Sequence, residues 1–178
     1  ECDGLGVKQF FDADLVAVQE ALRNDDRFGC DDQPALIAAG LRRLTGRPWT
    51  QAYAGARTST SLTCLERGGD GVPTEGVAFF APEPIIASKY VFLSEGRLGL
   101  VARVASMPDV PVTVTHLAAS SANQAGRANE LSRLLPWAER QGPGVLVGDL
   151  NATPEAEELA PLGERYLDAW AQATERGL

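Results

Sequence analysis

The chain lacks any long apolar run: none of its segments approaches the ~20 residues that a transmembrane helix needs. No signal-peptide pattern stands at Glu1 either. Because the first residue is not methionine, the sequence leaves the compartment open between cytoplasmic and exported. Histidine and methionine occur only once each among the 178 residues.

Basic residues are also scarce. Sixteen Lys and Arg stand against 24 Asp and Glu, for a net charge of −8. Proteins that bind nucleic acids tightly use Lys and Arg to neutralise phosphates, so this balance weakens a DNA- or RNA-binding interpretation. It does not exclude a hydrolase of phosphate esters, because a bound divalent cation supplies local positive charge.

The three cysteines, Cys2, Cys30 and Cys64, form no CxxC pair and have no metal-ligand spacing. Cys30 and Cys64 both lie in polar, glycine-rich segments. Two alternatives stay open: a disulfide between them in an exported protein, or free thiols in a cytosolic one. The odd number of cysteines decides neither.

Length and composition fit one soluble globular domain over residues 1–178, since ~100–200 residues is usual for a domain. A hydrophobic share of 44% with 22% charged residues argues against disorder. Strands are expected over 14–20, 49–54, 76–80, 85–93, 98–104, 111–118 and 145–148, with a long loop over 55–74.

Two long helices are expected between these strands. Asp32 is a candidate cap for a helix over 33–45 that Gly46 ends. Ser121 is a candidate cap for the second helix, in which Pro136 predicts a kink or an early end. Its buried stripe is expected to be Leu131, Leu134, Leu135 and Ala138.

The most informative segment is GPGVLVGDLNATPEAEEL, residues 142–159. An apolar strand runs into Asp149 and Asn151, which point to the same side because residues two apart on a strand share a face. Thr153 and Pro154 then suggest the start of a short helix. A carboxylate and a carboxamide at a strand end suit the binding of a phosphate and a water; an ordinary Asx turn is the alternative.

Three earlier segments also place polar residues at strand ends. Strand 14–20 ends in Gln19-Glu20, Glu75 opens another strand, and Thr115-His116 carries the one histidine. In this order the chain resembles the endonuclease/exonuclease/phosphatase superfamily, which includes deoxyribonucleases, bacterial sphingomyelinases and inositol-phosphate phosphatases. The family's signatures are a strand ending in Q-E, an acid opening a later strand, a T-H pair, and G-D-x-N-x-x-P, which residues 148–154 match.

The resemblance implies an α/β fold, a four-layer α/β sandwich of two face-to-face mixed sheets with outer helices. The near-continuous apolar strands agree with it. Members normally begin with a strand ending in a metal-holding Asn and close with a late Asp and a Ser-Asp-His segment, and neither is found here. We therefore expect an internal piece of a longer domain, incomplete at both ends, and weak or inactive by itself.

The resemblance also implies roles for three residues. Glu20 is the expected ligand of Mg²⁺ (or Mn²⁺), which favours hard oxygen ligands; a solvated acid at a strand end is the alternative. Asn151 would donate its amide N–H to a phosphate oxygen. Asp149 would orient or deprotonate the attacking water.

His116 resembles the family histidine that hydrogen-bonds the phosphate or protonates the leaving oxygen, although a lone histidine on a strand is more often structural. Glu75 resembles the acid that pairs with it, which would raise the histidine pKa. Arg97 resembles a phosphate-contacting arginine and could equally be a surface charge. Asp168 looks structural, as a residue that fixes a loop.

The sequence therefore predicts a metal-dependent phosphoester hydrolase, with Glu20, Glu75, His116, Asp149 and Asn151 at one rim of the sheets. A small phosphodiester or lipid head group is slightly favoured over nucleic acid as substrate. The alternative is a non-catalytic homologue that binds a phosphorylated ligand or acts as a scaffold. Substrate identity and oligomeric state stay open.

Overall fold

The computed structural model describes residues 13–57, 63–67, 72–119 and 123–177. Within these ranges, seven strands form two sheets. The first sheet is antiparallel throughout, with the order β1–β3–β2; the second has the order β4–β5–β6–β7, and only β6 and β7 run parallel. The strands are β1 (Val16–Arg23), β2 (Thr50–Arg57), β3 (Thr74–Ala81), β4 (Ile85–Ser94), β5 (Arg97–Val104), β6 (Met107–His116) and β7 (Val145–Asp149).

Alternation along β3 explains how the layers form. Val77 and Phe79 face the second sheet, where they pack against residues such as Leu100 and Val114. Phe80, on the opposite face of β3, packs under the helix α2 (Gln33–Thr45) together with Trp49. Since successive side chains of a strand point to opposite faces, one strand contributes to two cores.

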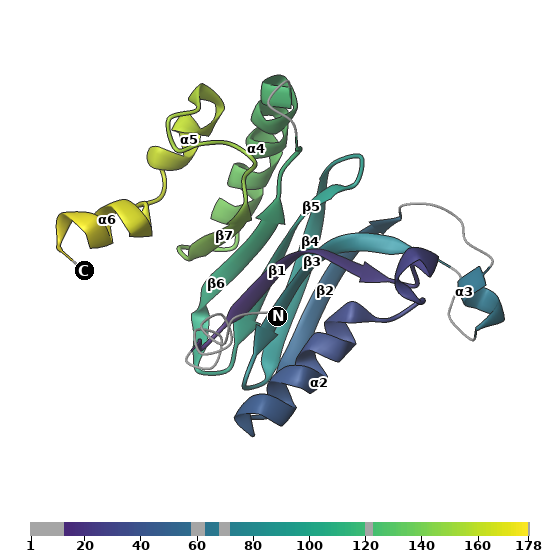
Figure 1. Cartoon of the computed structure of the whole chain (residues 1–178). Helices are drawn as coiled ribbons and strands as arrows, with labels where there is room; N and C mark the ends of the chain where they lie inside the picture. Colours follow the sequence, from purple (N-terminus) through teal and green to yellow (C-terminus); the bar gives the residue numbers. More distant parts are fainter. Residues whose placement is uncertain (1–12, 58–62, 68–71, 120–122, 178) are drawn as a thin grey trace.

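The outer face of the second sheet is covered by the helix α4 (Gln124–Glu139). Leu131, Leu134 and Leu135 of this helix pack against Leu93 and Leu117. The order helix, sheet, sheet, helix is visible in Figure 1. The predicted four-layer α/β sandwich is thus confirmed, but only the second of its two sheets is mixed among the described residues.

Capping explains the bounds of α2. The side chain of Asp32 accepts a hydrogen bond from the Ala35 N–H at 2.9 Å, and Gly46 ends the helix with a left-handed φ of 70°. Both ends agree with the sequence prediction. For α4, Pro136 does not end the helix, which continues to Glu139. The predicted cap, Ser121, lies outside the described residues.

Five short helices complete the described part of the chain: η1 (Asp26–Phe28), α3 (Thr63–Glu66), η3 (Glu157–Leu159), α5 (Ala160–Gly163) and α6 (Ala169–Glu175). Asp168 caps α6 by accepting hydrogen bonds from two backbone N–H groups, a structural role as predicted. Cys30 and Cys64 form a disulfide that joins the segment after η1 to α3.

Three local predictions were wrong. The strand of Gln19-Glu20 does not end there but passes through a bulge and continues to Arg23. The strand before Asp149 is not buried, since β7 is an edge strand among the described residues and Val145 is 47% exposed. Pro154 lies in a turn rather than at a helix start.

The α4 face should carry much of the stability. Leu134 is fully buried, so Leu134→Ala is expected to lower the free energy of unfolding by about 2–5 kcal/mol, as deletion of buried methyl groups leaves a cavity. Leu44→Ala, at a position 53% exposed on α2, is the matched control, with a change expected within about 0.5 kcal/mol. Urea denaturation measures both; equal losses would contradict the packing described here.

Candidate active site

The parallel pair β6 and β7 brings two predicted site residues together. His116 and Asp149 are register partners at the carboxyl ends of these strands, and the Leu117 N–H continues the ladder to the Asp149 carbonyl at 2.9 Å. His116 Nε2 lies 3.8 Å from Asp149 Oδ2. Carboxyl ends of parallel strands are where α/β folds commonly place functional groups.

Glycine makes this close pairing possible. Gly148 has a φ of 151°, and a Cβ added to it would lie 2.0 Å from the Thr115 carbonyl oxygen of β6. Any side chain at this position would therefore separate the two strand ends. The glycine of the G-D-x-N segment thus sets the distance between His116 and Asp149.

His116 is 5% exposed, and its Nδ1 lies 2.7 Å from an NH1 atom of Arg97 at the start of β5. A guanidinium has donors and no acceptor. Nδ1 must therefore accept, which assigns a neutral imidazole whose remaining proton is on Nε2. That proton faces the side of Asp149.

The pKa of His116 lies below its ordinary value, chiefly because burial disfavours the charged imidazolium and then because the Arg97 cation is adjacent. The carboxylates of Asp149, Glu20 and Glu75 act in the opposite direction. We expected a raised pKa from a carboxylate partner. That expectation was wrong because burial and Arg97 outweigh the acids.

Glu75 does not form the hydrogen bond with His116 that the sequence suggested. Among the described residues, neither a hydrogen bond nor an ion pair joins the two side chains. The imidazole of His116 is instead hydrogen-bonded to Arg97 through Nδ1. Glu75 nevertheless lines a narrow cleft of about 10 Å³ together with Arg97 and His116. Its contribution to the site is thus a nearby negative charge.

Glu20 lies in the β1 bulge, between the pairs that Val18 and Ala21 make with β3. Its φ of 56° is in the left-handed region, which residues other than glycine rarely adopt. The side chain is exposed, and its charge acts on His116. Bulges next to active sites commonly redirect a side chain, and this one turns Glu20 out of the strand pattern.

Asn151 is held in place on both sides. Its backbone N–H donates to Asp149 Oδ1 at 2.8 Å, and its side-chain Nδ2 donates to the Leu117 carbonyl at 2.9 Å. Its φ of 51° is again left-handed. The segment is therefore both an Asx turn and a candidate site. A carboxamide nitrogen carries two N–H donors, and the described residues accept from only one of them.

Two buried charged residues of α4 were missed from the sequence. Glu130 accepts a hydrogen bond from the Ala118 N–H at 2.8 Å, and Arg127 donates to the Ala118 carbonyl at 3.3 Å. Arg127 also pairs with buried Glu158 at 2.5 Å. Together they fix the segment that follows His116. Arg127, Glu130 and Leu134 are spaced at i, i+3 and i+7, which places them on one face of the helix. Because Leu134 was predicted to be buried, this spacing could have predicted the burial of the two charged residues.

The arrangement leads to a test that is independent of activity. Because the Arg97 cation lowers the His116 pKa, Arg97→Gln is expected to raise it. NMR titration of the ring protons reads this directly, since His116 is the one histidine of the chain. Arg133→Gln, on the exposed side of α4, should leave the pKa unchanged. A fall in the pKa on Arg97→Gln would contradict the contact.

Known proteins resemble this chain in sequence profile and in fold. The profile of the Endonuclease/Exonuclease/phosphatase family matches residues 5–177. No curated protein sequence matches the chain. The fold is shared with an endonuclease/exonuclease/phosphatase from Beutenbergia cavernae DSM 12333, at TM-score 0.66 and 20% identity over 94% of this chain and 49% of that one.

Other similar structures have named activities or ligands. One is ANGEL2, a 2′,3′-cyclic phosphatase in complex with adenosine-2′,3′-vanadate, at TM-score 0.61 and 20% identity over 90% of this chain and 46% of that one. Another is D. rerio TDP2 with a single-strand DNA product, at TM-score 0.58 and 17% identity over 96% and 61%. The chain thus spans about half to three fifths of these structures. With the family profile matched over nearly its whole length, the chain belongs to the endonuclease/exonuclease/phosphatase family.

Proposed function

We propose that the chain provides the catalytic centre of a divalent-metal-dependent hydrolase of phosphoester bonds. The observation that supports this best is the His116–Asp149 register pair at the strand ends, surrounded by Arg97, Glu20 and the held Asn151. Such a grouping of acids with a buried histidine and an arginine has no packing motive, because clustered carboxylates repel one another.

The donor set fits Mg²⁺ or Mn²⁺ in one particular way. Among the described residues, no three His, Cys, Asp or Glu side chains gather as a complete metal cage. Mg²⁺ is commonly held by one or two carboxylates with waters and substrate phosphate oxygens, and the exposed Glu20 suits that role. When bound, the cation would polarise the phosphoryl oxygen.

The protein's own groups would supply the other roles. Asp149, whose side chain is 53% exposed, would orient the attacking water and accept its proton. The Nε2–H of neutral His116 would donate to a phosphoryl oxygen on which charge develops, with Arg97 holding the ring. The free N–H of Asn151 would contact a second oxygen. Glu75 would add negative charge beside the histidine.

A small phosphodiester or a lipid head group is favoured over nucleic acid as substrate, because the net charge is −8. Within the described residues, no helix is long and apolar enough to span a membrane. The competing proposal is a homologue that binds a phosphorylated ligand without turnover, as a scaffold.

Hydrolysis by the full-length protein decides between these two. Bis(p-nitrophenyl) phosphate should be cleaved with Mg²⁺ or Mn²⁺, and EDTA should abolish the reaction until the cation is restored. Hydrolysis that persists after complete chelation would overturn the metal requirement. Binding of inorganic phosphate without cleavage of any phosphoester would favour the non-catalytic proposal.

A further inference from the structure

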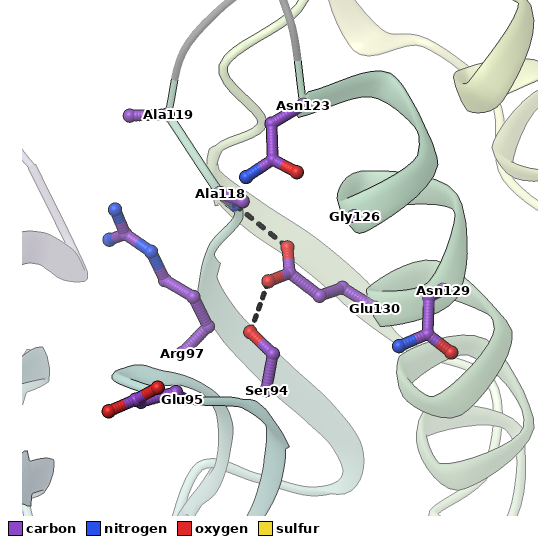
Figure 2. A pocket seen from close by; sticks show the side chains of 9 residues that line it. All are labelled: Ser94, Glu95, Arg97, Ala118, Ala119, Asn123, Gly126, Asn129 and Glu130. Atoms are coloured by element: carbon purple, nitrogen blue, oxygen red, sulfur yellow. Dashed lines mark hydrogen bonds between the residues drawn. The ribbon is translucent and has the colours of Figure 1, made fainter.

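A pocket of about 390 Å³ opens beside the candidate active site, between the start of α4 and the turn from β4 to β5. Figure 2 shows Arg97 and Glu95 across the pocket from α4. Its lining residues are Ser94, Glu95, Arg97, Ala118, Ala119, Asn123, Gly126, Asn129 and Glu130. The volume is at the lower end of ligand pockets, ~300–1,000 Å³, and suits a group of about monosaccharide size.

Arg97 connects this pocket with the catalytic groups. It lines the pocket, and it also lines the narrow cleft that contains His116 and Glu75. Its NH1 bonds His116 Nδ1 at 2.7 Å. A substrate whose phosphate lies against His116 would therefore have room for its alcohol part in the pocket. This step rests on the proposed function.

The floor of the pocket is rigid. Glu130 is 1% exposed, and its two carboxylate oxygens accept hydrogen bonds from the Ser94 hydroxyl and from the Ala118 N–H, as Figure 2 shows. One side chain thereby fixes α4, the end of β4 and the segment after β6. Because both oxygens of Glu130 already accept hydrogen bonds, we expect a ligand to be recognised by the other side chains that line the pocket.

Those walls offer uncharged hydrogen-bonding groups. Asn123 is the N-cap residue of α4, and within the described part of the chain its side chain makes no capping hydrogen bond. Its amide can therefore bind a ligand. Asn129, six residues further along the chain, adds a second amide. An amide has both donors and an acceptor, which suits hydroxyl groups, since a hydroxyl also donates and accepts.

Other ligand chemistries fit less well. None of the described lining residues is aromatic, so the pocket has neither a platform for stacking a base nor a cage for a quaternary ammonium group. The two acids of the lining, Glu95 and Glu130, outnumber its one cation, Arg97, which is hydrogen-bonded to His116. This balance disfavours a second phosphate. We propose that this pocket binds the uncharged, hydroxyl-bearing alcohol part of the phosphoester substrate, such as a sugar or polyol.

Gly126 provides a sharp variant for the test. A Cβ at this position would lie 2.2 Å from Asn123 Oδ1, so Gly126→Ala displaces the Asn123 amide without removing it. Alanine also favours a helix more than glycine does, so the fold should not lose stability. Asn123→Ala and Asn129→Ala delete the amides. Ser132→Ala, on α4 but outside the pocket, is the control.

The experiment measures kcat/KM of the full-length protein, with Mg²⁺, for three phosphate esters. These are a p-nitrophenyl phosphate ester, a phosphate ester of a sugar or polyol, and a bisphosphorylated polyol. Each pocket variant should lower kcat/KM for the polyol ester about five-fold, mainly through KM, because one hydrogen bond is lost. Values for the p-nitrophenyl ester should stay unchanged, as should every value for Ser132→Ala. Unchanged polyol cleavage in the variants, or a preference for the bisphosphate, would overturn the proposal.

A binding measurement separates this proposal from the proposed function. The Asn123 and Asn129 side-chain NH₂ signals in NMR should shift on titration with ribose 5-phosphate and not with inorganic phosphate. If p-nitrophenyl esters are not cleaved but these signals shift, the catalytic proposal fails and the pocket stands. If cleavage occurs and the signals do not move, the pocket proposal fails alone.

Discussion

Replacing His116 by alanine is expected to lower kcat/KM for phosphoester hydrolysis by about 10²- to 10³-fold, the usual effect of removing one donor to a developing oxyanion. This expectation follows from the tautomer of His116, which has its proton on Nε2. Arg97 donates to Nδ1, so the proton on Nε2 is the group that a phosphoryl oxygen would meet. Steady-state kinetics of the wild type and the variant measure the effect.

His116→Gln distinguishes a hydrogen-bond donor from a general acid. The glutamine amide nitrogen lies near the place of Nε2 and keeps an N–H, so the donor role predicts partial recovery relative to alanine. A general acid would not be restored, because an amide does not release its proton at neutral pH. Ser132→Ala serves as the control, and near-wild-type activity of His116→Ala would remove His116 from the mechanism.

The pH dependence follows from the direction of the pKa shift. Burial and Arg97 hold the His116 pKa below its ordinary ~6.5, so the imidazole is neutral at pH 7. Protonation of Nδ1 breaks the bond from Arg97. We therefore expect the protonation equilibrium of His116 to leave kcat/KM unchanged around neutral pH. The value should fall only as the pH drops through the lowered pKa, where the imidazole becomes charged. A loss of activity between pH 7 and 8 assigned to His116 would contradict this.

Sequence patterns predicted the grouping of His116 and Asp149 because each follows an apolar strand, and strand ends of one sheet lie at a common edge. The layers were predictable for a similar reason, since alternate apolar positions in β3 feed two cores. The common edge of the strand ends and the alternation along β3 are both regular features of sheets, so the spacing of residues along the chain predicts them.

Contacts between distant residues were not predictable in this way. The Arg97–His116 hydrogen bond joins residues 19 apart through the pairing of β5 with β6. The family resemblance had suggested the carboxylate of Glu75 as the partner instead. The bulge at Glu20 was also hidden, because its sequence continues as an ordinary strand. Whether a strand forms a bulge depends on its pairing with the neighbouring strand, which is distant in the sequence.

Two of the six predicted site residues have a left-handed backbone. Glu20 has a φ of 56° and Asn151 a φ of 51°. Such conformations cost of order 1–3 kcal/mol for residues other than glycine and are concentrated at functional sites. The two hydrogen bonds that Asn151 donates, one of them to Asp149, offset part of this conformational free energy. For Glu20 the surrounding β1–β3 pairs hold the bulge.

Glu20→Gln separates the charge of Glu20 from its backbone conformation. Glutamine has the same shape, so the bulge should persist while the carboxylate is lost. We expect kcat/KM to fall about 100-fold at limiting Mg²⁺, since loss of even an outer-shell partner weakens a metal site ~10–100-fold. Saturating Mg²⁺ should restore part of the activity, because the waters and substrate oxygens still bind the cation.

Two controls make the Glu20→Gln result specific to a metal. Glu164→Gln removes an exposed carboxylate outside the site and should change neither activity nor metal affinity. Calorimetric titration with Mn²⁺ should show weaker binding to Glu20→Gln, which a purely structural role for Glu20 would not produce. If Mn²⁺ affinity and the Mg²⁺ dependence of kcat/KM both match the wild type, Glu20 is a solvated acid in a bulge, and the cation must be held by other groups.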